Sequence, residues 1–332
     1  MSISDKLKIL RNILGRTYQS GDESLFYCPK CDHHKAKLSV NVEKNAFKCW
    51  VCDYSGSSIY RLVRRYGNYD QKRQWKKLDG VVDLDRFERL AHSLFEKQEE
   101  EIQETVSLPS EFVSLANKSS SHFDTQPRNY LNSRGITQED IVYWKIGYCP
   151  EGAYKNRIIV PSFGASGMPN YFVARTYSDD WKTYMNPNVS KNNMIFNHLY
   201  LDFDDDLVIT EGIFDAIVAG KNSVPLLGST LREGSKLFQE IVSNDTPVYM
   251  AMDSDAEKKA LMLINRLLSY GVEVHKIDIH PFSDVAEMTR DEFLKRKEES
   301  TILNLENYLF YKIKNSLETN NGNYKRATKT DY

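Results

Sequence analysis

The chain has 332 residues, of which 41% are hydrophobic and 27% are charged, and its formal net charge is −2. This composition is typical of a folded globular protein and excludes disordered and collagen-like chains, and no apolar run approaches the length of a membrane-spanning helix. Because the N-terminus lacks a basic segment followed by an apolar one, we expect no signal peptide, a cytoplasmic location and no membrane partner.

The near-neutral total conceals four blocks of different charge. Residues 1–77 carry a net charge of +9, residues 78–107 one of −6, residues 108–200 one of +2, and residues 201–332 one of −7. Taken alone, the total argues against a nucleic-acid binder, which usually has an excess of Lys and Arg. The asymmetry between segments is more informative, and it predicts a basic N-terminal module joined by an acidic connector to the rest. Ordinary surface charge is the alternative for any single block.

Four of the five cysteines form two C-x2-C pairs separated by seventeen residues. These are Cys28, Cys31, Cys49 and Cys52. Each pair offers two thiolates from one tight turn, and Zn²⁺ prefers four such soft ligands. The spacing therefore predicts one zinc ion in a closed, structural site. The remaining cysteine, Cys149, is expected to be a buried, inert thiol.

The segments between the two pairs predict a hairpin, with strands over 37–42 and 46–48. A zinc ribbon of this size has a thin core, so metal binding is expected to hold it together. His33 and His34 could replace a cysteine as ligands, but we favour two polar loop residues. His33, Lys48 and Trp50 together suit single-stranded nucleic acid, through backbone charge and base stacking. Packing of Trp50 beside the metal is an equally weighted alternative.

A basic helix over 58–66 follows the ribbon, and an amphipathic helix is expected over 83–104. Beyond it, strands are expected over 156–161 and 170–175. These strands and the next segment place three cations and an amide in one region, namely Arg157, Arg175, Lys182 and Asn186. We interpret them as a basic track for phosphate groups, with unrelated surface cations as the alternative.

The acidic C-terminal block carries the pattern with the clearest chemistry. An apolar strand over 207–210 ends at Glu211, and a second over 248–252 ends at Asp253 and Asp255. A helix over 256–270 and a further strand over 272–277 complete a predicted parallel sheet, whose ligands bind beyond the carboxyl ends of the strands. Converging carboxylates need a cation, and oxygen ligands favour Mg²⁺ or Mn²⁺. The pattern predicts a phosphoryl-transfer site.

The Glu211-Gly pair followed by the later D-x-D resembles the Toprim domain of DnaG-type primases, topoisomerases, OLD-family nucleases and RecR proteins. The preceding zinc ribbon, the Arg134-Gly-Ile segment and the cationic strands, in this order, make residues 25–300 resemble a compact, phage-type DnaG primase. The resemblance implies that Glu211, Asp253 and Asp255 are catalytic. It implies five acids as metal ligands: Glu211, Asp215, Asp253, Asp255 and Asp284. The second acid of the Asp284 motif is Ala286 here, with Glu287 as a possible substitute, and in strand 170–175 only Arg175 matches the family.

The resemblance also implies the fold class and the domains. The fold is expected to be α/β, with an N-terminal zinc ribbon of small β type, a helical connector, an α+β basic subdomain and a Toprim, Rossmann-like parallel sheet. The expected boundaries are 1–70 for the zinc-binding domain, 71–107 for the helical acidic linker, 108–200 for the N-terminal subdomain of the RNA polymerase domain, 201–300 for Toprim and 301–332 for a helical or disordered tail.

The implied activity is synthesis of short RNA primers on a single-stranded DNA template, using two Mg²⁺ or Mn²⁺ ions and ribonucleoside triphosphates. Partners would be the template, the RNA primer and, because no G-x-x-x-x-G-K-[ST] motif occurs, a replicative helicase on a separate chain. The cell would be a bacterium or a phage-infected bacterial host. The alternatives are another Toprim enzyme, such as a nuclease or topoisomerase, and a non-enzymatic DNA-binding mediator of the RecR kind.

Overall fold

A computed structural model describes most of the chain, in the ranges 3–56, 58–79, 106–117, 124–191, 193–228 and 231–303 together with Tyr308. It comprises two compact units, the first of residues 1–90, 267–273 and 302–332 and the second of residues 91–266 and 274–301. The helix expected over 83–104 and nearly all of the tail expected over 301–332 lie outside the described residues. Within the described ranges, every helix is too short or too polar to span a bilayer.

The first unit contains a five-stranded antiparallel sheet whose strands follow one another in chain order. The strands are β1 (Tyr18–Ser20), β2 (Glu23–Phe26), β3 (Leu38–Asn41), β4 (Ala46–Cys49) and β5 (Ser55–Gly56). β3 and β4 form the predicted hairpin, in a register that pairs Leu38 with Cys49 and Asn41 with Ala46. The hairpin therefore delivers the second cysteine pair directly from the end of a strand.

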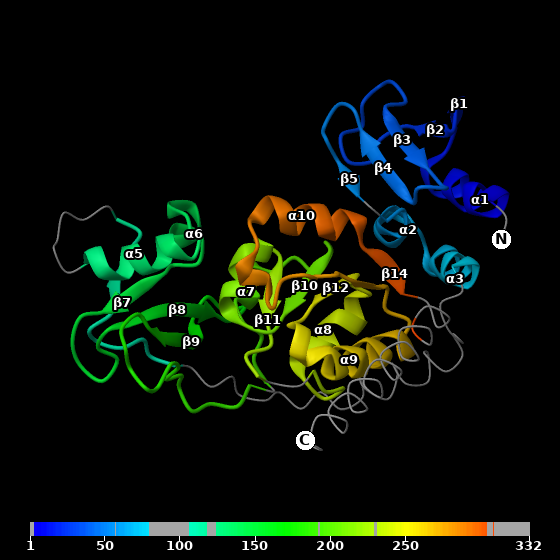
Figure 1. The fold of residues 1–332 in the computed structure, drawn as a ribbon. Helices are drawn as coiled ribbons and strands as arrows, with labels where there is room; N and C mark the ends of the chain where they lie inside the picture. Colours follow the sequence, from blue (N-terminus) through cyan, green and yellow to red (C-terminus); the bar gives the residue numbers. More distant parts are fainter. Residues whose placement is uncertain are drawn as a thin grey trace, which may run out of the picture. The chain divides into compact units, whose positions relative to one another are not determined.

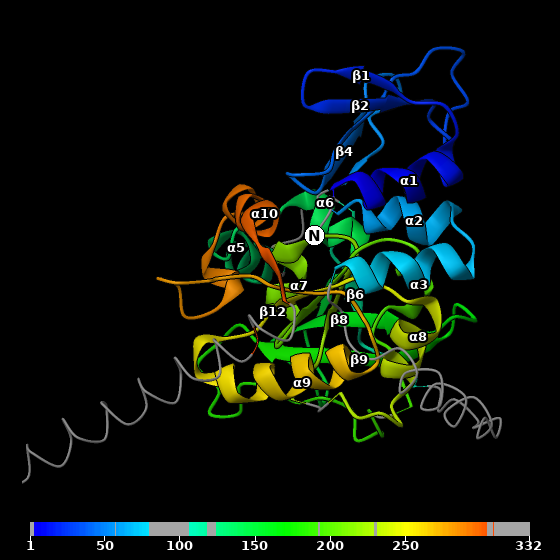
Figure 2. The same ribbon diagram turned by 90° about the vertical axis from the view of Figure 1, so that its right-hand side faces the viewer.

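Three helices complete this unit and supply much of its core. They are α1 (Ile3–Leu14), α2 (Tyr60–Tyr66) and α3 (Tyr69–Leu78), which pack against one another in both views (Figures 1 and 2). Asn68 and Gln71 cap α3 reciprocally, with side-chain to backbone hydrogen bonds of 3.0 and 2.8 Å. Leu10 and Trp75 are fully buried with Phe26 and Leu38 of the sheet. The core is thus thicker than a bare ribbon would give.

The second unit begins with a four-stranded antiparallel sheet and two short helices. The strands are β6 (Val113–Ser114), β7 (Gly147–Cys149), β8 (Arg157–Phe163) and β9 (Pro169–Thr176), and the helices are α5 (Thr125–Ser133) and α6 (Gln138–Tyr143). Cys149 is fully buried in the apolar cluster of this sheet, and burial raises the pKa of its thiol to about 11. The expectation of a buried thiol is confirmed.

The chain continues into a sheet in the order β11-β10-β12-β13-β14, in which β11, β10, β12 and β13 run parallel. The strands are β10 (Leu207–Thr210), β11 (Ser223–Pro225), β12 (Val248–Ala251), β13 (Val274–Lys276) and β14 (Thr301–Leu303). The helices are α7 (Ile213–Ala219), α8 (Lys236–Asn244), α9 (Glu257–Ser269) and α10 (Arg290–Glu299). Short 3-10 segments are η2 (His198–Tyr200), η3 (Ser254–Ala256) and η4 (Val285–Glu287).

Every residue of β10 and β12 is buried, as expected for central strands covered on both faces. Figures 1 and 2 show α7 and α10 on one side of this sheet and α8 and α9 on the other. The chain leaves β10 toward β11 on one side and returns to β12 on the other, so the strand order reverses at β10. Ligands of parallel sheets bind at such a reversal. The predicted mixed α/β fold with a small β unit at its N-terminus is confirmed.

Candidate metal centres and active site

The four cysteine sulfurs of the first unit converge. One ligand atom from each of Cys28, Cys31, Cys49 and Cys52 lies within 4.8 Å of all the others. The Sγ atoms of Cys28 and Cys52 are 3.8 Å apart, and those of Cys31 and Cys49 are 3.9 Å apart. A tetrahedron of sulfurs with metal–sulfur distances of about 2.3 Å has edges of about 3.8 Å. The cluster therefore fits a single zinc-type ion.

The protonation of these thiols is uneven. Burial raises the pKa of Cys28 to about 12. Burial also opposes ionisation of Cys49, but the backbone N–H groups of Cys52 and Val51 donate hydrogen bonds to its sulfur and bring its pKa down to about 7. A thiolate is the form that binds metal, so these backbone hydrogen bonds favour the metal-binding form of Cys49.

The surface beside the cysteines carries the residues expected to contact nucleic acid. The Trp50 ring is 65% exposed, and the Lys48 ammonium lies 5.1 Å from its centroid. Trp50 is thus not packed against the metal site. His33 Nδ1 accepts a hydrogen bond of 3.2 Å from the Lys35 amide, and the four-cysteine cluster needs no histidine.

Three of the predicted acids meet at the strand ends of the second unit. Glu211 directly follows β10, Asp253 and Asp255 follow β12, and their carboxylate oxygens lie within 4.8 Å of one another. Thr210 pairs with Ala251 across the two strands, which brings the following residues side by side. Oε2 of Glu211 and Oδ1 of Asp253 are buried and have no hydrogen-bond partner in the described structure. Unpartnered buried carboxylate oxygens fit a bound cation, and hard oxygen donors fit Mg²⁺ or Mn²⁺.

Asp215 lies beside this cluster but uses its carboxylate differently. Its Oδ2 accepts a hydrogen bond of 2.9 Å from the Gly212 amide, and its Oδ1 accepts one of 2.9 Å from the Ala286 amide. A Cβ on Gly212 would lie 2.7 Å from Asp215 Oδ2, so the glycine permits this close approach. Asp215 therefore ties the turn after β10 to the segment at η4, and both of its oxygens are occupied by backbone donors.

Asp284 lines the same cavity, at the start of η4. Its Oδ1 accepts a hydrogen bond of 3.0 Å from the Glu287 amide, while Glu287 Oε2 accepts one of 2.7 Å from the Ser283 amide. Glu287 is exposed, and its carboxylate caps this turn. Ala286 contributes its backbone amide to Asp215 instead.

The crowding of these acids perturbs Asp253 most. Burial raises its pKa, and the negative charges of Asp215, Glu211, Asp284 and Asp255 raise it further, to about 7. Asp253 and these four neighbours therefore form a group of five carboxylates that interact electrostatically. A divalent cation would relieve this repulsion, which is the usual reason for clustering acids at a functional site.

Cations and aromatic rings form the wall of the cavity around the acids. The cavity encloses about 430 Å³ and is lined by Arg134, Arg175, Tyr184 and Asn186 as well as by Glu211, Asp253 and Asp284. The guanidinium groups of Arg134 and Arg175 lie 5.0 and 5.4 Å from the Phe214 ring centroid. Arg175 also donates a hydrogen bond to the Tyr184 hydroxyl. Both arginines are thereby held beside the acid cluster.

Of the predicted basic track, the structure brings Arg175 and Asn186 to the cavity. Asn186 Oδ1 accepts a hydrogen bond of 3.1 Å from the Ala174 amide. Lys182 lies exposed in the segment after β9. Arg157 differs from the expectation, because it is only 3% exposed and forms an ion pair with Asp180. Its guanidinium holds the loop after β9 rather than facing a phosphate.

Sequence reasoning missed Arg134 and Lys259. Arg134 precedes the glycine that ends the helix α5, a position that by itself suggests only a helix C-terminus. Lys259 lies in the first turn of α9, and its Nζ is 2.9 Å from Glu211 Oε1. Its position four residues after Asp255 was the available signal.

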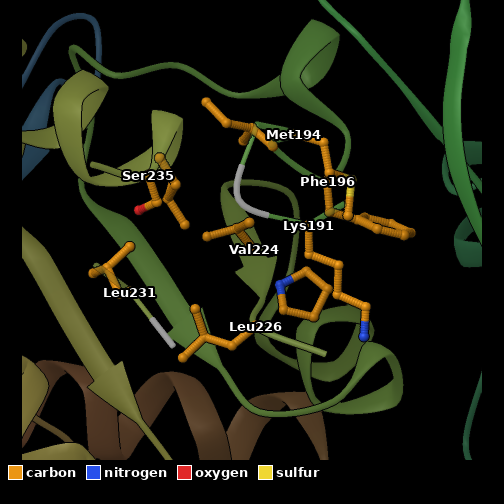
Figure 3. Close-up of a pocket in the computed structure, with 10 residues that line it drawn as sticks. Lys191, Met194, Phe196, Val224, Leu226, Leu231 and Ser235 are labelled. Atoms are coloured by element: carbon orange, nitrogen blue, oxygen red, sulfur yellow. The ribbon is translucent and has the colours of Figure 1, made fainter. Parts of the chain in front are cut away.

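A second, small cavity of about 20 Å³ lies beside Lys191 and is otherwise lined mainly by apolar side chains such as Val224, Leu226 and Leu231 (Figure 3). Burial lowers the pKa of Lys191, whose Nζ donates a hydrogen bond of 2.6 Å to the Leu227 carbonyl. The Leu227 amide in turn donates to the Glu211 carbonyl at 2.9 Å. Leu227 has a positive φ of 53° and borders the acidic cavity. Lys191 therefore supports a turn that lines the site.

Several solved structures show similarity to the chain, among them two of primase domains. The zinc-binding and RNA polymerase domains of the Aquifex aeolicus primase share 19% identity with it at a TM-score of 0.47, covering 90% of this chain and 84% of that one. A DNA primase domain from Pseudomonas aeruginosa shares 18% identity at a TM-score of 0.48, covering 68% and 82%.

No protein-family model matches the chain. Sequence comparison finds similarity to DNA primases. It is 19% identical to the DNA primase of Staphylococcus epidermidis over 94% of this chain and 62% of that protein. It is 22% identical to the DNA primase of Thermotoga maritima over 80% of this chain and 54% of that protein. The chain thus spans between 54% and 62% of the length of these two relatives. The sequence similarity to these DNA primases confirms the resemblance that the motifs predict.

Proposed function

We propose that this chain is a DNA primase, which synthesises short RNA primers on single-stranded DNA by metal-dependent nucleotidyl transfer. One observation carries the proposal: three carboxylates lie within 4.8 Å of one another, and two of them, Glu211 and Asp253, line a cavity that two arginines also line. Clustered acids for divalent cations beside fixed cations for phosphate are the parts that phosphoryl transfer requires. The similarity to DNA primases along most of this chain supports the same activity.

Within this proposal, Glu211, Asp253 and Asp255 hold two Mg²⁺ or Mn²⁺ ions, with Asp284 at the edge of the site. Bound metal supplies Lewis acidity to the attacking hydroxyl and to the pyrophosphate leaving group. Asp215 has a positioning role, because its two oxygens fix the backbone on either side of the cluster. Ribonucleoside triphosphates are the substrates.

Arg175 and Arg134 would bind the phosphates of the incoming nucleotide or of the growing strand. A planar guanidinium contacts phosphate oxygens through two parallel hydrogen bonds. Both guanidinium groups lie over the Phe214 ring, and Arg175 also donates a hydrogen bond to Tyr184. These contacts hold the two groups in place before substrate arrives. Such preorganised charge is a large part of electrostatic catalysis.

The first unit would bind the template. Zinc on the four cysteines stabilises its sheet, while Trp50 and Lys48 present an exposed ring and a cation to unpaired bases and phosphates. DNA binding at this surface and a separate replicative helicase as partner belong to the proposal.

The proposed activity is tested by incubating the full chain with ribonucleoside triphosphates, Mg²⁺ and random single-stranded DNA. We expect short RNA products, detected by incorporation of a labelled ribonucleotide. Asp253→Asn should reduce incorporation at least about a thousandfold, because it removes a metal ligand while keeping the side-chain shape. The variant should still bind the DNA, as measured by fluorescence anisotropy.

Other outcomes identify the alternatives. Metal-dependent cleavage of the DNA without ribonucleotides would indicate a nuclease. DNA binding with neither synthesis nor cleavage would indicate a mediator, and full synthesis by Asp253→Asn would contradict the assignment of the acid cluster.

A further inference from the structure

The acid cluster already has one fixed cation. Lys259 Nζ lies 2.9 Å from Glu211 Oε1, and the two side chains are 24% and 26% exposed. The other Glu211 oxygen, Oε2, is buried without a hydrogen-bond partner in the described structure. In the expected metal site, Glu211 therefore has one oxygen paired with a lysine and a second, buried oxygen that is available to a metal ion.

The location of this lysine is electrostatically unusual. α9 begins at Glu257, so Lys259 lies in its first turn, where the helix dipole disfavours positive charge. The neighbouring Lys258 is exposed, whereas Lys259 is drawn to Glu211. The carboxylate of Glu211, which is clustered with those of Asp253 and Asp255, supplies the attraction. Lys259 thus compensates charge inside the site and not on the helix surface.

We propose that Lys259 is a built-in counter-cation, which a divalent metal displaces from Glu211 when it binds, so that this lysine sets the metal affinity of the site. An ammonium group and a divalent ion on the same carboxylate group repel each other and compete for its negative charge. The flexible four-carbon stem of lysine allows the ammonium group to move away. This inference rests on the proposed function, because it requires that the acid cluster holds metal.

Binding of Mn²⁺ to the full chain, followed by electron paramagnetic resonance, tests the proposal. Lys259→Met should bind Mn²⁺ roughly three- to tenfold more tightly than the unchanged protein, as the loss of a partly exposed competing ion pair implies. Lys259→Arg keeps the charge and should stay within about twofold. Lys258→Met removes a charge from the same turn without touching Glu211 and should also change the affinity less than about twofold.

A thermal readout separates competition from simple structural support. With a chelator present, Lys259→Met should melt at a lower temperature than the unchanged protein, because Glu211 loses its partner. Saturating Mn²⁺ should raise the melting temperature of the variant more than that of the unchanged protein, because the metal then meets no competitor. Equal increases in both proteins would overturn the proposal.

The metal site itself is checked with Asp253→Asn. If this variant loses Mn²⁺ but Lys259→Met binds the ion as the unchanged protein does, the role of Lys259 is wrong and the proposed function stands. If Asp253→Asn binds Mn²⁺ as tightly as the unchanged protein, the acid cluster is not the metal site. In that case both this inference and the metal assignment of the proposed function fail.

Discussion

The two ligand clusters of this protein are built in opposite ways. The cysteines come from two turns beside one small antiparallel sheet, and their four sulfurs, all within 4.8 Å of one another, would fill the four positions of a tetrahedral site. The acids come from the ends of two parallel strands and from a later turn, and Glu211, Asp253 and Asp284 border a cavity of about 430 Å³. The first cluster closes on itself, whereas the second remains open to a substrate.

This difference follows from what holds each cluster in place. The sheet of the first unit is short, so a metal bound to its cysteines would be part of the fold, worth about 10–16 kcal/mol in small zinc peptides. The carboxylates of the second unit are positioned by buried strands and by the backbone hydrogen bonds of Asp215. We therefore expect the first cluster to need its metal for folding and the second to need metal only for chemistry.

The largest expected effect is loss of the first unit when a cysteine is removed. Cys49→Ser deletes one of four ligands, and the chain should lose its zinc and the protease resistance of residues 3–79. Zinc content by mass spectrometry and limited proteolysis measure both. Cys149→Ala, which removes the buried thiol of the second unit, should keep the zinc. A protease-resistant, zinc-free first unit would contradict the expectation that the first cluster needs its metal for folding.

A large effect on activity is expected at the cationic wall of the open site. Arg175→Ala should lower kcat/KM for ribonucleotides about a hundredfold, because the variant loses a fixed charge placed beside the acids. Steady-state incorporation on a defined template measures this. Lys155→Ala removes an exposed cation from the same unit and serves as the control, with an expected change below about twofold. An equal loss in both variants would mean that net charge, and not the cavity, matters.

When metal is absent, repulsion among the acids of the open site should lower the free energy of unfolding. The pKa of Asp253 is raised from 3.8 to about 7, so the folded protein keeps a proton that the unfolded chain releases in this interval. The corresponding stability is present below about pH 4 and is lost as the pH rises through 7. Asp253→Asn should therefore raise the free energy of unfolding by about 1–2 kcal/mol at pH 8, and by less at pH 5.

Urea unfolding in the presence of a chelator measures this difference. Glu298→Gln, at an exposed carboxylate of α10, should leave the pH dependence of the unchanged protein intact. An Asp253→Asn variant that is less stable than the unchanged protein at pH 8 would show that the acids do not repel one another as the geometry implies.

The smallest effect is expected at the hydroxyl that orients Arg175. Tyr184→Phe keeps the ring that faces the guanidinium at 4.9 Å and removes only the hydrogen-bond acceptor. We expect KM for ribonucleotides to rise about two- to fivefold, with kcat nearly unchanged, because the arginine becomes less well positioned. A change confined to kcat would place Tyr184 in the chemical step instead.

The sequence by itself determined the parts that local chemistry specifies. The C-x2-C spacing predicts the converging sulfurs, because each pair needs only one tight turn. The strand over 207–210 and the position of Glu211 after it follow from an apolar run and from the sheet rule that groups strand ends. The sequence pattern did not predict the helices α1 and α3. Their contribution to the core of the first unit is seen only in the structure, where Leu10 and Trp75 are buried together.

The tertiary structure decided which charges meet. Arg157 and Arg175 begin and end similar strands, yet Arg157 is buried against Asp180 while Arg175 borders the acids. Charge pattern cannot separate them, since pairing depends on a loop that folds back across the sheet. The same holds for Asp215, whose partners at Gly212 and Ala286 are distant from each other in the chain. Spacing names the ligand types, but only the packing of distant segments sets which oxygens remain free for a metal.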